Sequence, residues 1–211
     1  MPDPTVFVVD DDEAVRNSLQ WLIQSVSINV QTFADAREFL ERYNRDDPGC
    51  LVLDVRMPGM SGLELQEVLE QRGIHLPVII ITGHANVPMA VRAMKAGAAE
   101  FIEKPFRDQE LLDQIQLAIE RDSKNRARRE AVRHIHNRLA RLTPRENEVM
   151  ELVVAGHSSK QIAALLEINQ KTIEAHRAHV MKKMGAASVA DLVREVLSAR
   201  AVEESQPTVG N

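Results

Sequence analysis

The stretch VVDDDE at residues 8–13 places three aspartates directly behind an apolar segment. The run that leads into it, TVFVV at residues 5–9, is short and apolar, which is typical of a buried strand. Neighbouring carboxylates repel one another, and each becomes harder to ionise unless a cation lies close by. The end of this expected strand is therefore the first candidate for a functional site.

Further apolar runs follow the first strand and alternate with amphipathic segments. The runs are NVQTF, CLVLDV, PVIIITG and EFIEKP. The segments between them carry apolar residues at spacings of three and four, as amphipathic helices do. Strands that alternate with helices predict a parallel sheet covered on both faces. We therefore expect residues 1–120 to form an α/β domain with a doubly wound, five-stranded parallel sheet.

Several polar residues fall where these expected strands end. They are Asp10 and Asp11 after the first strand, Asp54 at the end of the third, Thr82 at the end of the fourth, and Lys104 with Pro105 after the fifth. In a doubly wound sheet these ends meet at one edge, where ligands bind. Taken singly, each residue fits a helix cap or a solvated charge, and Asp12 fits a cap of the first helix. Three carboxylates at one edge need a cation, so the sequence predicts a Mg²⁺ site.

A magnesium ion beside a carboxylate, a hydroxyl and an ammonium is suited to phosphoryl transfer, which needs chiefly positioning and compensation of charge. Asp54 is then the expected nucleophile. The sequence contains no Walker-type glycine loop and no GxGxxG motif, so it does not predict nucleotide binding. An alternative is an enzyme whose acidic pocket hydrolyses small phosphate esters, but Val55 and Arg56 stand where a second acid would be needed.

The motifs VVDDDE, LVLDVRMPGMSGLEL, IIITGH and FIEKPF together resemble the receiver domain of two-component response regulators, over about residues 4–120. The resemblance implies a CheY-like fold in which Asp54 accepts a phosphoryl group from a sensor histidine kinase. It implies that Asp11, Asp54 and the backbone carbonyl of Arg56 bind Mg²⁺ directly. Asp10 would then reach the ion through a water molecule.

The same resemblance assigns roles to residues on the fourth and fifth strands. It implies that Thr82 and Lys104 contact the phosphoryl oxygens and that the bond between Lys104 and Pro105 is cis. Phe101 resembles the family's switch aromatic, although a plain strand residue is the alternative interpretation. His84, two residues past Thr82, holds a place that in this family tunes the lifetime of the phosphoryl group.

A basic connector follows this domain. Residues 1–106 carry a net charge of −7, residues 121–141 carry +6 and residues 142–211 carry −1. No Pro or Gly occurs from Asp108 to Leu142, so we expect residues 121–141 to continue one long helical linker. Its weak apolar seam, formed by Val132, Ile135 and Leu139, would suit pairing with a second copy of the chain. The positive charge fits either a solvated helix face or non-specific attraction to DNA phosphates.

Residues 142–200 predict an all-α domain of four short helices. The expected helix starts are Thr143 with Glu146, Ser158 with Gln161, Asn169, and Ser188 with Asp191. In the helix at residues 170–184, Ile173, Val180 and Met184 fall on one face at 100° per residue. Small residues and lysines occupy the opposite face, namely Lys171, Ala175, Ala178 and Lys182. Such a face suits a helix that enters a DNA groove, although a merely solvated surface is the alternative.

The motifs LTPRE, GHSSKQIA and KTIEAHRAHVMKKM resemble the LuxR-type helix-turn-helix of the FixJ/NarL regulators, over about residues 141–200. By this resemblance, the residues expected to contact the DNA backbone are Lys171, Thr172, Arg177 and Lys182. Those expected to face base edges are Glu174, Ala175 and Ala178. The net charge of −1 does not by itself favour DNA, so affinity would depend on local cations, the connector and dimerisation.

The two resemblances together predict a transcriptional regulator of a two-component system, controlled by phosphorylation and not an enzyme. The expected partners are a sensor histidine kinase, double-stranded promoter DNA, RNA polymerase and, after phosphorylation, a second copy of the chain. An alternative is a pure interaction module whose helices never touch DNA; DNA retention that depends on salt would separate the two.

Composition agrees with a globular cytoplasmic protein. Hydrophobic residues make up 44% of the 211 residues and charged residues 27%. No apolar run approaches the roughly 20 residues of a membrane span, so we expect no membrane association. Cys50 is the only cysteine, which excludes an internal disulfide. We expect residues 201–211 to form a disordered tail.

Overall fold

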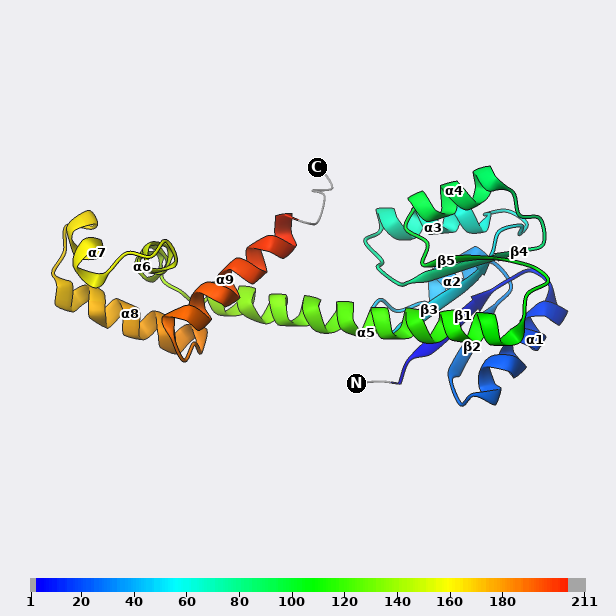
Figure 1. The fold of residues 1–211 in the computed structure, drawn as a ribbon, viewed down its shortest axis with the longest axis horizontal. Coiled ribbons are helices and arrows are strands. Elements are labelled where there is room, and N and C mark those ends of the chain that lie inside the picture. Colours follow the sequence, from blue (N-terminus) through cyan, green and yellow to red (C-terminus); the bar gives the residue numbers. More distant parts are fainter. Residues whose placement is uncertain (1–2, 205–211) are drawn as a thin grey trace. The chain divides into compact units, whose positions relative to one another are not determined.

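A computed structural model describes residues 3–204. The chain divides into two compact units, Met1–Arg126 and Ala127–Asn211. Their helices and strands are labelled in Figure 1, and each unit is described by itself. No helix within residues 3–204 is long and apolar enough to cross a membrane.

The first unit is built on a five-stranded parallel sheet with the order β2-β1-β3-β4-β5. Its strands are β1 (Thr5–Val9), β2 (Asn29–Phe33), β3 (Gly49–Asp54), β4 (Val78–Thr82) and β5 (Glu100–Glu103). The central strands β1 and β3 pair in register, so that Val6 lies opposite Cys50 and Val9 opposite Leu53. This topology confirms the expected doubly wound sheet and brings the carboxyl ends of β1 and β3 side by side.

Helices cover both faces of the sheet. They are α1 (Glu13–Ser25), α2 (Ala36–Arg42), α3 (Gly62–Gln71), α4 (Val87–Lys95) and α5 (Asp108–Leu139). Phe7 and Val9 point into a core with α2, α3 and α4, whereas Val6 and Val8 point into a second core with α1 and α5. Figure 1 shows α3 and α4 on one side of the sheet and α1 and α5 on the other. Alternate side chains of one buried strand thus serve two cores, which explains why β1 is apolar throughout.

The loop after β3 begins α3 against the end of β3. Ser61 and Glu64 form the expected capping box at the start of α3. The Gly62 N–H donates to the Val55 carbonyl at 3.0 Å. A Cβ atom on Gly62 would lie 2.2 Å from the Asp54 carbonyl oxygen, closer than any side chain tolerates. Glycine is therefore required here because the helix start must approach the backbone of Asp54.

Helix α5 is one continuous helix of 32 residues, and its first part belongs to the first unit. The buried carboxylate of Asp122 accepts hydrogen bonds from the Gly49 N–H at 2.9 Å and from Arg126 Nε at 2.6 Å. Arg126 also donates to the Asp47 carbonyl. These bonds hold residues 121–126 to the sheet, so the boundary that we expected at residue 120 lies later in the structure.

The second unit packs four helices against the end of α5. They are α6 (Pro144–Val154), α7 (Ser159–Leu165), α8 (Gln170–Met184) and α9 (Val189–Glu204). Val132 and Ile135 of α5 are buried among them, in one core with Ile162 and Ile173. The apolar seam that we expected to pair with a second copy is therefore covered within its own unit.

The start of each helix in the second unit agrees with the sequence pattern. Thr143 and Ser158 form capping boxes, and Asn169 caps α8. The Ser188 side chain accepts from the Asp191 N–H at 3.1 Å. Helix α9 has 16 residues, so it is longer than expected and includes residues 201–204. The remainder of the expected disordered tail lies outside the described residues.

Candidate functional site

Lys104 joins two buried carboxylates at the carboxyl edge of the sheet. Its Nζ lies 2.8 Å from Asp10 Oδ2 and 2.8 Å from Asp54 Oδ1. Asp10 is 1% exposed and Asp54 is 6% exposed, so neither charge is compensated by water alone. Lys104 follows β5 and precedes Pro105 through a cis peptide bond, as expected. Three residues at the carboxyl ends of three separate strands thus meet in one ion-paired cluster.

Backbone groups hold the second oxygen of each carboxylate. Asp10 Oδ1 accepts from the Asp12 N–H at 2.9 Å, and Asp54 Oδ2 accepts from the Arg56 N–H at 2.6 Å. Asp12 in turn caps α1, because its side chain accepts from the first amides of that helix. Both carboxylates therefore present one oxygen to Lys104 and keep the other fixed by the chain.

The pKa values of the cluster reflect burial and pairing. Burial raises the pKa of Asp54 above its ordinary value, and the hydrogen bond from Lys104 offsets only part of this rise. Burial would lower the pKa of Lys104, but its bonds to Asp10 and Asp54 outweigh burial and raise it. Lys104 therefore stays charged at neutral pH, whereas the ionised form of Asp54 would gain from a further cation.

Thr82 ends β4, and Phe101 lies on β5, the strand that leads to Lys104. Thr82 is buried; its Oγ1 accepts from the His84 N–H at 3.3 Å, and its carbonyl accepts from the Lys104 N–H at 2.8 Å. Phe101 lies opposite Ile80 in the sheet and is half-buried against the core that α2, α3 and α4 cover. The structure thus links Thr82 to Lys104 directly and places Phe101 on the face of the sheet below α4.

Asp11 and Arg56 have exposed side chains. Asp11 lines a hollow of about 410 Å³ together with Asp35, Pro58 and other residues of the adjoining loops. Within residues 3–204, no three side chains of His, Cys, Asp or Glu lie close enough together to hold a metal ion. The structure brings Asp10 and Asp54 together around Lys104 and places Asp11 at the adjoining hollow.

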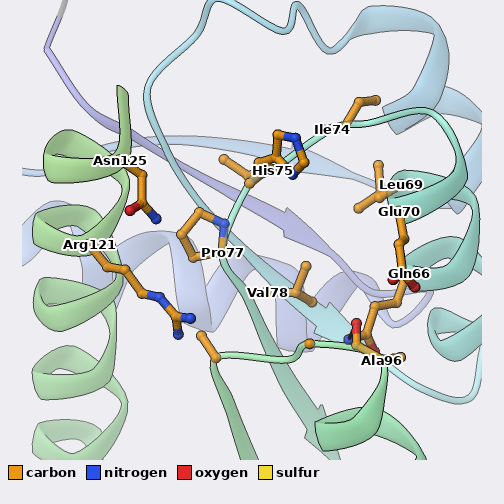
Figure 2. Close-up of a pocket in the computed structure, with 13 residues that line it drawn as sticks. Gln66, Leu69, Glu70, Ile74, His75, Pro77, Val78, Ala96, Arg121 and Asn125 are labelled. Atoms are coloured by element: carbon orange, nitrogen blue, oxygen red, sulfur yellow. Dashed lines mark hydrogen bonds between the residues drawn. The ribbon is translucent and has the colours of Figure 1, made fainter. Parts of the chain in front are cut away.

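A second hollow, of about 280 Å³, lies at the opposite edge of the sheet, where β4 begins. Figure 2 shows Arg121 and Asn125 of α5 on one side of it and Leu69 and Glu70 of α3 on the other. It contains none of the expected site residues. Because ligands of doubly wound sheets bind at the carboxyl edge, we assign no role in phosphoryl transfer to this hollow.

Helix α8 carries the candidate nucleic-acid interface of the second unit. Ile173, Val180 and Met184 are buried as predicted, so the opposite face is left to solvent. The expected contact residues on that face are all exposed, namely Lys171, Thr172, Glu174, Ala175, Ala178 and Lys182. Arg177 differs, because it is half-buried and its Nη1 donates to the His157 carbonyl at 3.4 Å.

The sequence patterns did not predict one residue that contacts the cluster of Asp10, Asp54 and Lys104. Arg16 on α1 donates from Nη1 to the Asp10 carbonyl at 2.7 Å, and so holds the end of β1 in place. A signal was present, because Arg16 is the only Lys or Arg before residue 37 and follows three aspartates. Its partner is a backbone carbonyl, which side-chain patterns do not predict.

Family models match both units. A model described as the response regulator receiver domain matches residues 6–116. A second model, described as bacterial regulatory proteins of the luxR family, matches residues 140–196. The first match covers every residue of the Lys104 cluster, and the second covers all of α8.

Individual proteins are similar along most of the chain. Nodulation protein W of Bradyrhizobium diazoefficiens is 51% identical over 189 residues, which cover 90% of this chain and 83% of that protein. The transcriptional regulatory protein TdiR of Thauera aromatica is 45% identical over 195 residues, covering 92% and 85%. A low-resolution structure of the response regulator StyR is 45% identical with a TM-score of 0.86, and the match covers 93% of this chain and 99% of that one.

Proposed function

Because the chain belongs to the response regulators that combine a receiver domain with a LuxR-type helix-turn-helix domain, we propose that Asp54 receives the phosphoryl group. Membership makes the protein a phosphorylation-controlled, DNA-binding transcriptional regulator of a two-component system. The family consists of regulators and is in general not enzymatic. We propose that the present chain is likewise not an enzyme. Its cluster of Asp10, Asp54 and Lys104 would carry a phosphoryl group and would not hydrolyse small substrates.

The contact between Asp54 and Lys104 is the observation that supports the proposal most strongly. Asp54 ends β3, is buried and keeps one oxygen 2.8 Å from the ammonium. In the transfer, the bond between phosphorus and a histidine nitrogen of the kinase breaks while a bond between phosphorus and an Asp54 oxygen forms. Lys104 and the hydroxyl of Thr82 would then donate hydrogen bonds to the phosphoryl oxygens, where negative charge collects.

Receiver domains generally bind Mg²⁺ for phosphorylation. The groups at this edge fit that ion, because Asp10, Asp11 and Asp54 offer carboxylate oxygens and Arg56 offers a backbone carbonyl. Asp11, Asp54 and the Arg56 carbonyl would bind the ion directly, with Asp10 reaching it through water. The raised pKa of Asp54 supports this assignment, since a second cation favours the carboxylate. When bound, the ion supplies positive charge beside the phosphoryl oxygens.

Phosphorylation would act on the rest of the chain through Thr82 and Phe101. Thr82 and Lys104 would move toward the phosphoryl group, and Phe101 would follow into the space beside β4. The surface around α4 and β5 would change its preferred contacts as a result. This change would either release the second unit or pair two chains, so that two α8 helices meet DNA half-sites about one turn apart.

The receiver domain implies a sensor histidine kinase as partner, and the LuxR-type domain implies DNA. For the DNA contact, the backbone residues would be Lys171, Thr172, Arg177 and Lys182, and the base-facing residues Glu174, Ala175 and Ala178. Double-stranded promoter DNA, RNA polymerase and a second phosphorylated copy of the chain complete the proposed set of partners. These partners would place the protein in the cytoplasm.

Selection of bound duplexes from a random DNA pool, with and without a small-molecule phosphodonor and Mg²⁺, tests this function. The proposal expects one sequence to be enriched, and enriched more strongly after phosphodonor treatment. No enrichment in either condition would contradict it. Release of phosphate from small esters at a steady rate by the same protein would favour the hydrolytic alternative instead.

A further inference from the structure

The acidic residues of the second unit are largely taken up by internal ion pairs. On α6, Glu146 lies 2.6 Å from Lys183 and Glu148 lies 2.6 Å from Arg145. A third residue of α6, Glu151, pairs with Arg200. On α9, the pairs are Asp191 with Arg194 at 2.5 Å and Glu195 with Arg138 at 3.1 Å. Five cations are thereby neutralised close to the acids that they serve.

Other cations of this unit remain unpaired. Within the described part of residues 127–201, the side chains of Arg141, Lys171 and Lys182 are exposed and form no ion pair or hydrogen bond. Residues 142–211 carry a net charge of −1 and the whole second unit, residues 127–211, carries +3. Within this unit the paired residues cancel, and unpaired cations remain around α8. A local positive surface attracts phosphate more strongly than the small net charge of the unit alone would suggest.

Arg141 lies beside the C-terminal end of α8, although it precedes Lys182 by 41 residues in the sequence. Its carbonyl accepts a hydrogen bond from Lys183 Nζ at 3.1 Å. Close by, Arg138 donates to the carbonyl of Met184, the last residue of α8. Arg141 thus follows directly from α5 and is fixed next to the last turn of α8.

The C-terminal end of a helix repels phosphate, because its free carbonyls carry a partial negative charge. Lys183 does not overcome this repulsion, since its ammonium is held by Glu146 at 2.6 Å. Among the residues that the structure places at this end of α8, Lys182 and Arg141 keep exposed, unpaired cations. These two cations are therefore available to the phosphates of a DNA backbone that passes this end of α8.

We propose that Arg141 binds a backbone phosphate of the DNA beyond the C-terminal end of α8, and so extends the surface formed by Lys171 and Lys182. The inference rests on the proposed function, because it requires that α8 enter the DNA groove. Arg141 reads no base in this arrangement. It adds affinity for every sequence equally, since phosphate contacts position a protein without specifying the sequence.

The test measures the dissociation constant of the full-length, phosphodonor-treated protein for its selected duplex across a series of NaCl concentrations. For Arg141→Gln we expect the slope of log affinity against log salt to become shallower by about 0.9, as for loss of one phosphate contact. Affinity should fall by the same factor for the selected duplex and for a random one. Arg141→Lys should keep the wild-type slope, because it keeps the charge.

Arg133→Gln is the matched control, because Arg133 is an exposed cation on α5 that faces Glu130 at 3.9 Å. An unchanged slope for this variant supports the proposal. Equal changes for Arg133→Gln and Arg141→Gln would overturn it, because they would indicate an effect of net charge alone. A wild-type slope for Arg141→Gln would also overturn the proposal about Arg141. In that case, sequence-specific DNA binding by the parent protein would still support the proposed function. Failure of the parent protein to prefer any duplex would reject both.

Discussion

The ammonium of Lys104 lies 2.8 Å from Asp54 Oδ1, although 50 residues separate the two along the chain. The same ammonium lies 2.8 Å from Asp10. One cation therefore compensates for two buried carboxylates, and its removal would leave them facing each other without a partner. This relationship connects the stability of the sheet edge to the chemistry that we assign to Asp54.

Replacing Lys104 with Met should destabilise the first unit at neutral pH by about 2–3 kcal/mol when Mg²⁺ is removed by a chelator. Breaking a fully buried ion pair costs about 3–5 kcal/mol, and the side chain of Lys104 is 23% exposed, so a smaller loss is expected. Urea unfolding followed by the fluorescence of Trp21 measures this loss. Arg92→Gln breaks the exposed pair with Glu67 and should cost less than about 1 kcal/mol. Equal stability of both variants would contradict the assigned role of Lys104.

Gly62→Ala should disturb the site through the backbone. The added methyl group would lie 2.2 Å from the Asp54 carbonyl oxygen, and a backbone atom cannot move aside as a flexible side chain does. We expect a loss of about 1–3 kcal/mol and slower phosphorylation of the protein. Gly83→Ala is the control, because an added methyl group there meets nothing within 4 Å. If Gly62→Ala and Gly83→Ala both had the same urea midpoint as the parent protein, the close approach of α3 to β3 would be refuted.

Ile135→Ala should destabilise the second unit by about 2–4 kcal/mol, because Ile135 is 6% exposed and its truncation leaves a cavity. Residues 127–211 contain no Trp, Tyr or Phe, so far-UV circular dichroism has to follow this unit while Trp21 fluorescence reports on the other. Leu117→Ala removes a 58% exposed residue of the same helix and should change little. If Ile135→Ala instead lost self-association and kept its stability, Ile135 would contact a second copy of the chain, as the sequence pattern had suggested.

Acid should weaken the second unit through Glu146. Hydrogen bonds from Lys183 and from Thr143 lower the pKa of Glu146 from 4.5 to about 2. Because the folded-state pKa is the lower one, these bonds stabilise the fold fully above about pH 4.5, and their contribution disappears as the pH falls to about 2. Glu146→Gln should therefore reduce the dependence of stability on pH in this window. Parallel curves for variant and parent, measured by circular dichroism, would contradict the assignment.

Much of the fold follows from local patterns in the sequence. Apolar runs and helical spacing predict the five strands and their order of appearance, and short-range caps such as Ser61 with Glu64 predict helix starts. Each of these patterns involves residues only a few positions apart, so it can be recognised without knowledge of the tertiary structure. The burial of Ile173, Val180 and Met184 was predictable for the same reason.

Long-range polar contacts escape such reasoning. The Gly49 N–H donates to Asp122, which lies 73 residues later, and this bond helps extend the first unit to Arg126. The seam of Val132 and Ile135 was visible as an apolar stripe, but a stripe does not specify the partner that covers it. At the acidic edge, the sequence predicted that Asp10, Asp54 and Lys104 lie at the same edge of the sheet, whereas only the structure shows that Lys104 bridges the two carboxylates.

The mass of the intact protein after incubation with a small-molecule phosphodonor and Mg²⁺ tests the central claim most directly. We expect the parent protein to gain one phosphoryl group on Asp54, and Asp12→Asn to gain it as well, because asparagine also caps a helix. Asp54→Asn should gain none. Uptake of the phosphoryl group by Asp54→Asn at the parent's rate would contradict the account.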